Sequence, residues 1–193
     1  MRGSATKISF CFILVLSTCS LFAQKKVLIA YYSQAGATAK MAEYVASGVK
    51  SVAGVIPVTK PIQEVVQKDL LEADAIIVGT PVYNAMVSSP VVSFISTWPF
   101  ENQPLKNKVG AVFVTAGGIS AGEELAQMQI LQSMMVFGMI VVGGDEWTSA
   151  FGASAVMQEG SFQLEDSKQP AKLFLDKAYG LGKRVATLTQ FIQ

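Results

Sequence analysis

The stretch VLIAYYSQAGAT, residues 27–38, decides the fold, because an apolar run passes through a glycine-containing loop directly into a helical pattern. The run Val27–Tyr32 has the length and composition of a strand that is buried on both faces. Apolar residues then recur at helical spacing, which predicts a helix over Ala37–Ser51. A strand, a short loop and a helix in this order are typical of a parallel α/β sheet.

The same alternation continues along the chain. Further strands are expected at Val55–Val58, Asp74–Thr80, Val109–Thr115 and Met139–Gly143. Further helices are expected at Ile62–Leu71, Ser89–Trp98, Gly122–Phe137 and Lys168–Ile192. Continuously apolar strands that alternate with helices predict an α/β three-layer sandwich, a five-stranded parallel sheet of order 2-1-3-4-5. The Gly/Ser/Ala-rich excursion Gly143–Ser167 breaks the alternation, and its length is typical of an active-site loop or an oligomer contact.

Composition excludes several classes of function. The 193 residues suggest one domain, and with 51% hydrophobic and 15% charged residues the chain can build a core. A formal net charge of +1 does not favour nucleic acid as a partner. Histidine is absent from the sequence, which excludes histidine-ligated metals and histidine-dependent nucleophiles, so no metal site is predicted.

Residues 1–23 have the pattern of a targeting segment. Arg2 and Lys7 precede the apolar run Ile8–Leu16, and small residues follow up to Ala23. This predicts an export leader cleaved after Ala23, a domain over 24–193 and a periplasmic or extracellular location. Two alternatives stay open: an N-terminal membrane anchor through residues 8–23, and a lipoprotein modified at Cys19.

Removal of this segment would change the chemistry available to the chain. Both cysteines, Cys11 and Cys19, lie within it, so a chain that begins at Gln24 has no thiol. The loss of Arg2 and Lys7 lowers the formal net charge from +1 to −1. We therefore expect a bound organic group, rather than a catalytic side chain, to supply any chemistry.

The loop after the first strand is a candidate anion site. Ligands of such sheets bind at the carboxyl ends of the strands, where the strand order reverses. A helix N-terminus there offers unpaired N–H groups and a partial positive charge, Gly36 allows close approach, and two hydroxyls can donate. The alternative is an ordinary helix cap. The candidate phosphate-binding residues are Ser33, Gln34, Ala35, Gly36, Ala37 and Thr38.

Two more loops should meet this one at the same edge of the sheet. After the third strand, a stiff turn could place an aromatic ring and hydrogen-bonding groups against a planar ligand, at Pro81, Val82, Tyr83 and Asn84. After the fourth strand, small residues could form a backbone-lined shelf, at Thr115, Ala116, Gly117 and Gly118. Taken singly, the loop after the third strand is explained by a surface turn, and the loop after the fourth strand by a flexible loop. Their coincidence with the first loop predicts one binding site.

These residues resemble a known family. The stretch IAYYSQAGAT, residues 29–38, resembles the FMN phosphate signature of flavodoxins. Gly79–Tyr83 and Thr115–Gly118 resemble the flavin-ring loops of NAD(P)H-dependent FMN reductases and of tryptophan-repressor-binding-protein-like quinone oxidoreductases. The similarity covers Lys26–Val142 well and the remainder loosely, and it implies a flavodoxin-like fold with FMN as cofactor.

The resemblance also assigns roles to residues. It implies that Ser33, Gly36, Ala37 and Thr38 hold the phosphate, that Pro81, Val82, Tyr83 and Asn84 flank the isoalloxazine, and that Thr115, Gly117 and Gly118 bond its far edge. Two departures concern the substrate side. Asn84-Ala85 stands where relatives often have a glycine, and Gly143–Trp147 stands where they tend to carry a histidine near the flavin.

The favoured hypothesis is an FMN-dependent oxidoreductase that uses NAD(P)H as reductant and a small quinone-like acceptor. Tyr83 and Trp147 are the expected stacking residues for that acceptor, and no certain catalytic side chain is predicted. The alternatives are a flavodoxin-type electron carrier and a flavodoxin-like binding module without catalysis. We further expect a homodimer, no nucleic-acid partner, and contact with a membrane only through the N-terminal segment if that segment is retained or lipidated.

Overall fold

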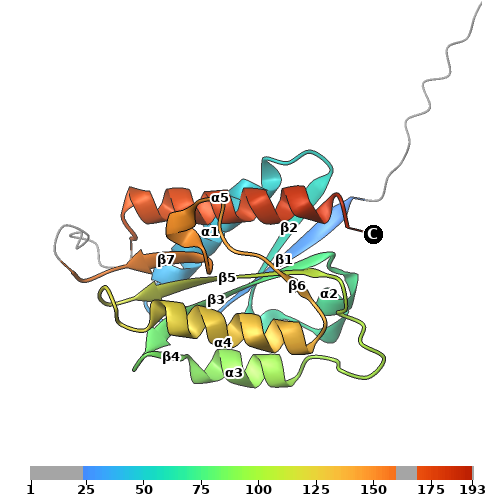
Figure 1. Ribbon diagram of the computed structural model, residues 1–193, viewed down its shortest axis with the longest axis horizontal. Helices are drawn as coiled ribbons and strands as arrows, with labels where there is room; N and C mark the ends of the chain where they lie inside the picture. The colour runs from blue at the N-terminus through green and yellow to red at the C-terminus, as the bar shows by residue number, and fades with distance from the viewer. Residues whose placement is uncertain (1–23, 160–168, 193) are drawn as a thin grey trace, which may run out of the picture.

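The computed structural model describes residues 24–159 and 169–192, and within them it shows a three-layer α/β sandwich (Figure 1). The strands are β1 Lys25–Tyr31, β2 Val55–Pro61, β3 Ala75–Tyr83, β4 Met86–Val87, β5 Val109–Ala116, β6 Ile140–Val141 and β7 Ala153–Val156. The helices are α1 Ala37–Lys50, α2 Gln67–Glu72, α3 Ser89–Ser96, α4 Glu123–Val136 and α5 Lys172–Thr189, with 3-10 turns η1 Ile62–Glu64 and η2 Trp147–Ser149.

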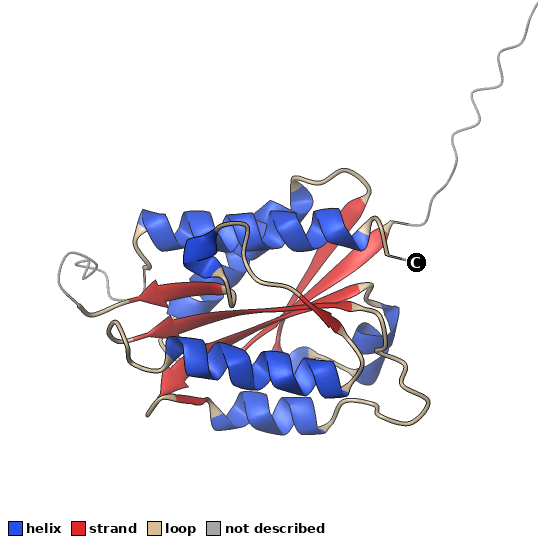
Figure 2. Ribbon diagram, in the orientation of Figure 1, coloured by secondary structure: helices blue, strands red, loops and turns tan. Residues whose placement is uncertain are grey.

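The main sheet is parallel and has the order β2-β1-β3-β5-β6. Helices α1 and α5 cover one face, and α3 and α4 cover the other (Figure 2). Since both faces are covered, β5 is buried along its whole length, which explains its unbroken apolar run. The predicted fold class and strand order are therefore confirmed, but the described sheet has seven strands rather than the predicted five, because β4 pairs with β3 and β7 pairs with β5.

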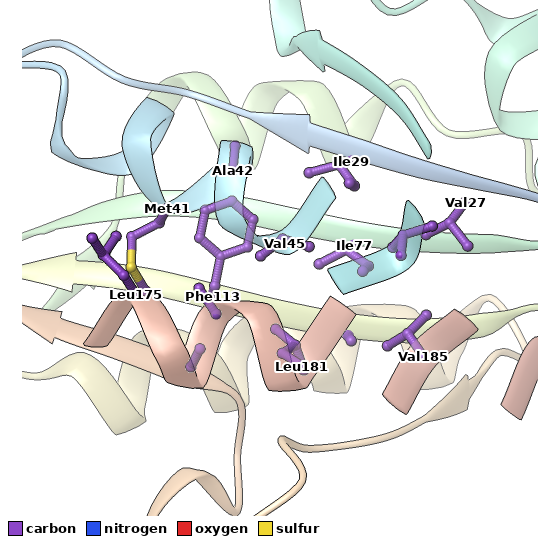
Figure 3. Packing of buried hydrophobic residues seen from close by; sticks show 14 of the residues in the cluster. Val27, Ile29, Met41, Ala42, Val45, Ile77, Phe113, Leu175, Leu181 and Val185 are labelled. Atoms are coloured by element: carbon purple, nitrogen blue, oxygen red, sulfur yellow. The ribbon is translucent and has the colours of Figure 1, made fainter. Parts of the chain in front are cut away.

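The core has one layer on each side of the sheet. In the layer under α1 and α5, strand residues Ile29, Ile77 and Phe113 pack against helix residues such as Met41 and Leu181 (Figure 3). The two helices approach closely because both contribute glycines. A Cβ on Gly48 of α1 would lie 2.0 Å from the carbonyl oxygen of Tyr179 in α5, so no larger residue fits there.

The fifth strand differs from the prediction, because it is divided in two. β6 pairs with the start of β5 and β7 pairs with its end, while the chain between them leaves the sheet. Glycines permit this departure: a Cβ on Gly143 would lie 1.9 Å from the carbonyl oxygen of Ala150, and Gly152 has φ +137 beside Val112. As a result, β7 reaches the carboxyl end of the sheet beside β5.

Other differences are local. The predicted helix Ile62–Leu71 is wrong in its middle, because Val65 and Val66 are extended and divide it into η1 and α2. β3 runs on into a hairpin with β4, whose turn places Asn84 and Ala85 at φ 52 and φ 59. The predicted leader, the predicted modification at Cys19, residues 160–167 of the excursion and residue 168 of the predicted last helix lie outside the described residues. Among the described helices, none combines the length and apolar character needed to cross a bilayer.

Candidate functional site

A cavity of about 280 Å³, here called the strand-end cavity, opens where the loops after β1, β3 and β5 meet. Its lining residues are all uncharged, and they are Gln34, Ala35, Ala37, Thr38, Pro81, Val82, Tyr83, Thr115, Ala116, Gly117, Met157 and Gln158. The first ten belong to the three loops that the sequence singled out. An uncharged lining at the edge of a parallel sheet suits a neutral ring system more than a metal or a polycation.

The first loop ends in an open helix start. Gly36 precedes α1 with φ 102, a left-handed conformation that glycine adopts without strain. No side chain caps the helix, and its first turn holds no acidic residue. The Ser33 hydroxyl accepts a hydrogen bond from the Gly36 N–H at 3.2 Å, which closes the loop on itself. The N–H groups and the dipole at the start of α1 are therefore available to an external anion.

The second loop is the β3–β4 hairpin, and it contacts the first loop. The Tyr83 hydroxyl donates to Oε1 of Gln34 at 3.0 Å. Burial, with a smaller contribution from Tyr32, raises the pKa of the Tyr83 phenol, so it stays protonated at neutral pH and can donate this bond. Pro81 and Val82 supply the wall of the cavity between Tyr83 and the sheet. Asn84 lies at the exposed hairpin tip and does not line the cavity.

The third loop follows β5, and a buried hydroxyl pair joins it to the first. Oγ1 of Thr115 lies 2.8 Å from Oγ1 of Thr38. A Cβ added to Gly117 would meet only Oε1 of Gln158, at 3.8 Å, so the shelf has free space above it. Gly118 faces Glu159 instead, and does not line the cavity.

Met157 and Gln158 form part of the cavity that the sequence did not predict. Their N–H groups donate to the carbonyl oxygens of Ala116 and Gly117, both at 2.9 Å. They reach the site because β7 extends the divided fifth strand to the end of β5. The signal available in the sequence was the short, mostly apolar stretch ASAVM, residues 153–157, immediately after Gly152.

Of the remaining predicted residues, Ser33 and Gly36 shape the first loop without lining the cavity. Trp147 is 89% exposed in η2 and does not line the cavity either. That segment contacts α5, where Lys177 donates to the carbonyl oxygen of Thr148 and Arg184 donates to that of Gly144. The structure therefore brings Tyr83, but not Trp147, to the candidate site.

A larger cavity, about 500 Å³, lies between α3 and α4 beside Met86 and Val136. It includes no helix start, and of the three strand-end loops it takes in only Met86 and Val87 of the β3–β4 hairpin, so it has no feature that would recognise a phosphate. Within residues 24–159 and 169–192, no three acidic, cysteine or histidine side chains gather as metal ligands. The strand-end cavity is therefore the candidate site.

The residues present fit a phosphorylated planar ligand. The open start of α1 can accept a phosphate, while Pro81–Tyr83 and Thr115–Gly117 provide two uncharged walls for a ring. Neither wall carries a carboxylate that would repel an anionic ligand. This chemistry matches the FMN site that the sequence resemblance implies.

Comparisons with known proteins identify the family of the chain. A family model described as NADPH-dependent FMN reductase matches residues 56–154. A flavodoxin from Aquifex aeolicus is 32% identical over 171 residues, covering 83% of this chain and 85% of that protein. An NAD(P)H dehydrogenase (quinone) from Methylocella silvestris is 29% identical over 191 residues, covering 83% of this chain and 95% of the relative.

Solved structures show the same fold. The flavodoxin, WrbA-like protein from Agrobacterium tumefaciens superimposes with a TM-score of 0.70 at 21% identity. The match covers 88% of this chain and 99% of that protein, so the whole sandwich is shared.

Proposed function

Because the chain belongs to the NADPH-dependent FMN reductase family of flavodoxin-like proteins, we propose that it is an FMN-dependent oxidoreductase performing two-electron, NAD(P)H:quinone-type reduction. FMN supplies the hydride-transferring centre when it is bound. The protein's own task is then to hold the cofactor, to orient two planar reactants in turn and to limit their access to water.

The three strand-end loops would share this task. The start of α1, with Thr38 beside it, would hold the phosphate. Pro81, Val82 and Tyr83 would flank the ring on one side, and Ala116 and Gly117 would form the shelf on the other. Tyr83 is 44% exposed at the rim of the cavity, where its ring can stack on an incoming quinone or nicotinamide.

One observation carries the cofactor assignment. The start of α1 has neither a side-chain cap nor an acidic residue, and it adjoins an uncharged cavity formed by two further strand ends. Helices α3 and α5 also lack a side-chain cap and an acidic residue in the first turn, so the feature that distinguishes α1 is the uncharged cavity beside its start. The open start therefore favours a ligand that brings its own negative charge.

Turnover measurements test the activity. FMN-loaded protein is expected to oxidise NADH or NADPH with benzoquinone faster than the same concentration of free FMN. The Tyr83→Phe variant keeps the ring but loses the bond to Gln34, whereas Tyr83→Ala removes the stacking surface, so only the second should raise KM for the quinone strongly. Oxidation of neither nicotinamide above free FMN would overturn the proposed reaction.

A one-electron carrier is the second candidate, and the flavodoxin relative from Aquifex aeolicus favours it. A redox titration of the FMN-loaded protein separates the two functions. A single two-electron step supports the reductase, whereas two well-separated one-electron steps support the carrier. A protein that stays colourless after incubation with FMN would instead support a binding module without a cofactor.

Export and assembly belong to the same proposal. We propose that residues 1–23 are an export leader, supported by the positive residues before an apolar run of signal-peptide length. N-terminal sequencing of the native protein should then begin at Gln24. We also propose a homodimer, for which static light scattering should give twice the mass of the mature chain.

A further inference from the structure

A pair of buried hydroxyls joins the phosphate loop to the ring shelf. Thr38 is 2% exposed and Thr115 is 5% exposed, and their Oγ1 atoms lie 2.8 Å apart. Thr38 is the second residue of α1, whereas Thr115 lies near the end of β5, behind that helix start. Both side chains line the strand-end cavity, but only Thr38 belongs to the helix turn with the open N–H groups.

The protons of this pair limit how it can meet an anion. Each threonine hydroxyl has one proton to donate and two lone pairs that accept. One of the two must donate to the other, and the short separation alone allows either direction. A phosphate accepts hydrogen bonds, so Thr38 can bond it only with its own proton. The proton between the two threonines must then come from Thr115.

We propose that Thr115 is a positioning residue, which donates to Thr38 and so directs the Thr38 proton toward a phosphate at the start of α1. This role rests on the proposed FMN site and assigns Thr115 to phosphate recognition through Thr38, rather than to the ring edge. Two consecutive hydrogen bonds polarise each other, which strengthens the outer bond to the anion. The contact with Thr115 also holds the Oγ1 atom of Thr38 in place before binding, so the side chain has little rotational freedom left to lose.

The test compares FMN with riboflavin, which lacks the phosphate. Dissociation constants for both are measured by quenching of flavin fluorescence, with wild type, Thr115→Val, Thr115→Ser, Thr38→Val and the double valine variant. Thr115→Val is expected to weaken FMN by about 3- to 10-fold, the range of one modest hydrogen bond, and to leave riboflavin unchanged. Thr115→Ser keeps the hydroxyl and should restore FMN affinity.

The double variant tests whether Thr115 acts through Thr38. In a Thr38→Val background, adding Thr115→Val should not change the ratio of FMN to riboflavin affinity any further. A direct contact between Thr115 and the ligand would instead give additive losses. Thermal unfolding of each variant without flavin verifies folding, and Thr115→Ala takes the place of Thr115→Val if the valine variant does not fold.

The outcomes separate this inference from the proposed function. Wild type that binds riboflavin as tightly as FMN would overturn the phosphate site itself. Wild type that prefers FMN, with the same preference in Thr115→Val, would overturn only the positioning role. Equal losses of FMN and riboflavin in Thr115→Val would also overturn it, because they would place Thr115 against the ring.

Discussion

Helices α1 and α4 begin with the same backbone conformation, but they differ in the charge of their first turns. Each follows a central strand, and each is preceded by a glycine in the left-handed region, Gly36 at φ 102 and Gly122 at φ 97. The first turn of α4 contains Glu123 and Glu124, and Oε1 of Glu123 accepts a hydrogen bond from the Ser120 N–H at 3.0 Å. The first turn of α1 contains no acid.

In the proposed site, this difference explains why one loop of the sheet would bind an anion and its neighbour would not. A carboxylate in the first turn stabilises a helix by neutralising its positive end, and it repels any external anion from the same place. α4 supplies this negative charge from its own sequence. α1 leaves the position open, so a phosphate can occupy it.

The largest expected effect comes from adding a methyl group at either glycine. Gly122→Ala should lower the free energy of unfolding by about 3 to 4 kcal/mol, because the left-handed backbone is strained and the new Cβ would lie 2.4 Å from Cα of Ala85. Gly36→Ala should lower it by only about 1 to 2 kcal/mol, from backbone strain. Urea denaturation of both variants measures the difference, and equal losses would contradict the closer packing at α4.

The second-largest expected effect comes from a variant of α1 that carries an acidic residue in its first turn, as α4 does. Ala39, partly buried in the first turn of α1, is replaced by glutamate. Repulsion of a few kcal/mol between like charges predicts that Ala39→Glu weakens FMN on the order of 100-fold, while riboflavin is retained. The glutamate should also stabilise the unliganded helix slightly.

The matched control for this variant is Ala39→Gln, which has nearly the same shape without the charge. Both variants are titrated with FMN and riboflavin at low ionic strength, where the repulsion is least screened. Ala39→Gln should keep most of the FMN affinity. If Ala39→Glu bound FMN as tightly as the glutamine variant, the phosphate could not lie at this helix start.

The smallest expected effect concerns α2, which, like α4, has an acidic residue in its first turn. Asp69 accepts from the Val66 N–H at 2.9 Å and from Nζ of Lys60 at 2.8 Å. The Lys60 bond, followed by the Val66 bond, lowers the pKa of the Asp69 carboxyl. Its contribution to stability is therefore complete above the unfolded pKa, near 4, and is lost as the pH falls through the lower folded value.

Accordingly, Asp69→Asn should lower the free energy of unfolding by about 1 kcal/mol at pH 7 and by less as the pH falls below about 4. Urea denaturation at several pH values measures this dependence. A difference between variant and wild type that stayed constant down to pH 2 would contradict the ionic origin of the effect. α1 carries no such carboxylate, so its start should show no comparable acid sensitivity.

The sequence predicted those parts of the molecule where one local pattern decides the structure. β1 and β5 are buried on both faces, so their apolar runs were unambiguous, and the loops after them follow from the fold rule for ligand sites. The β3–β4 hairpin was missed, because its turn holds Ala85 in the left-handed region, which alanine rarely adopts. Only the contact with Gly122, distant in the sequence, identifies that turn.

The divided fifth strand was missed for a related reason. The predicted strand Met139–Gly143 contains β6, but β7 is made mainly of small residues, so β7 gives no strong strand pattern by itself. Each is held by pairing with β5, a contact that sequence periodicity does not record. Met157 and Gln158 therefore line the cavity because β7 pairs with β5. Trp147 lies away from the cavity, because its segment contacts α5.

The glycine contact between α1 and α5 has a consequence for the order of folding. One face of the sheet is closed by two helices from nearly opposite ends of the described chain, with Gly48 against Tyr179 and Gly182 against Val45. Until α5 leaves the ribosome, it cannot pack over Ile29, Ile77 and Phe113, and the nascent polypeptide cannot complete its core. Such long-range closure slows folding. The proposed export leader would therefore act on a chain whose core is not yet complete.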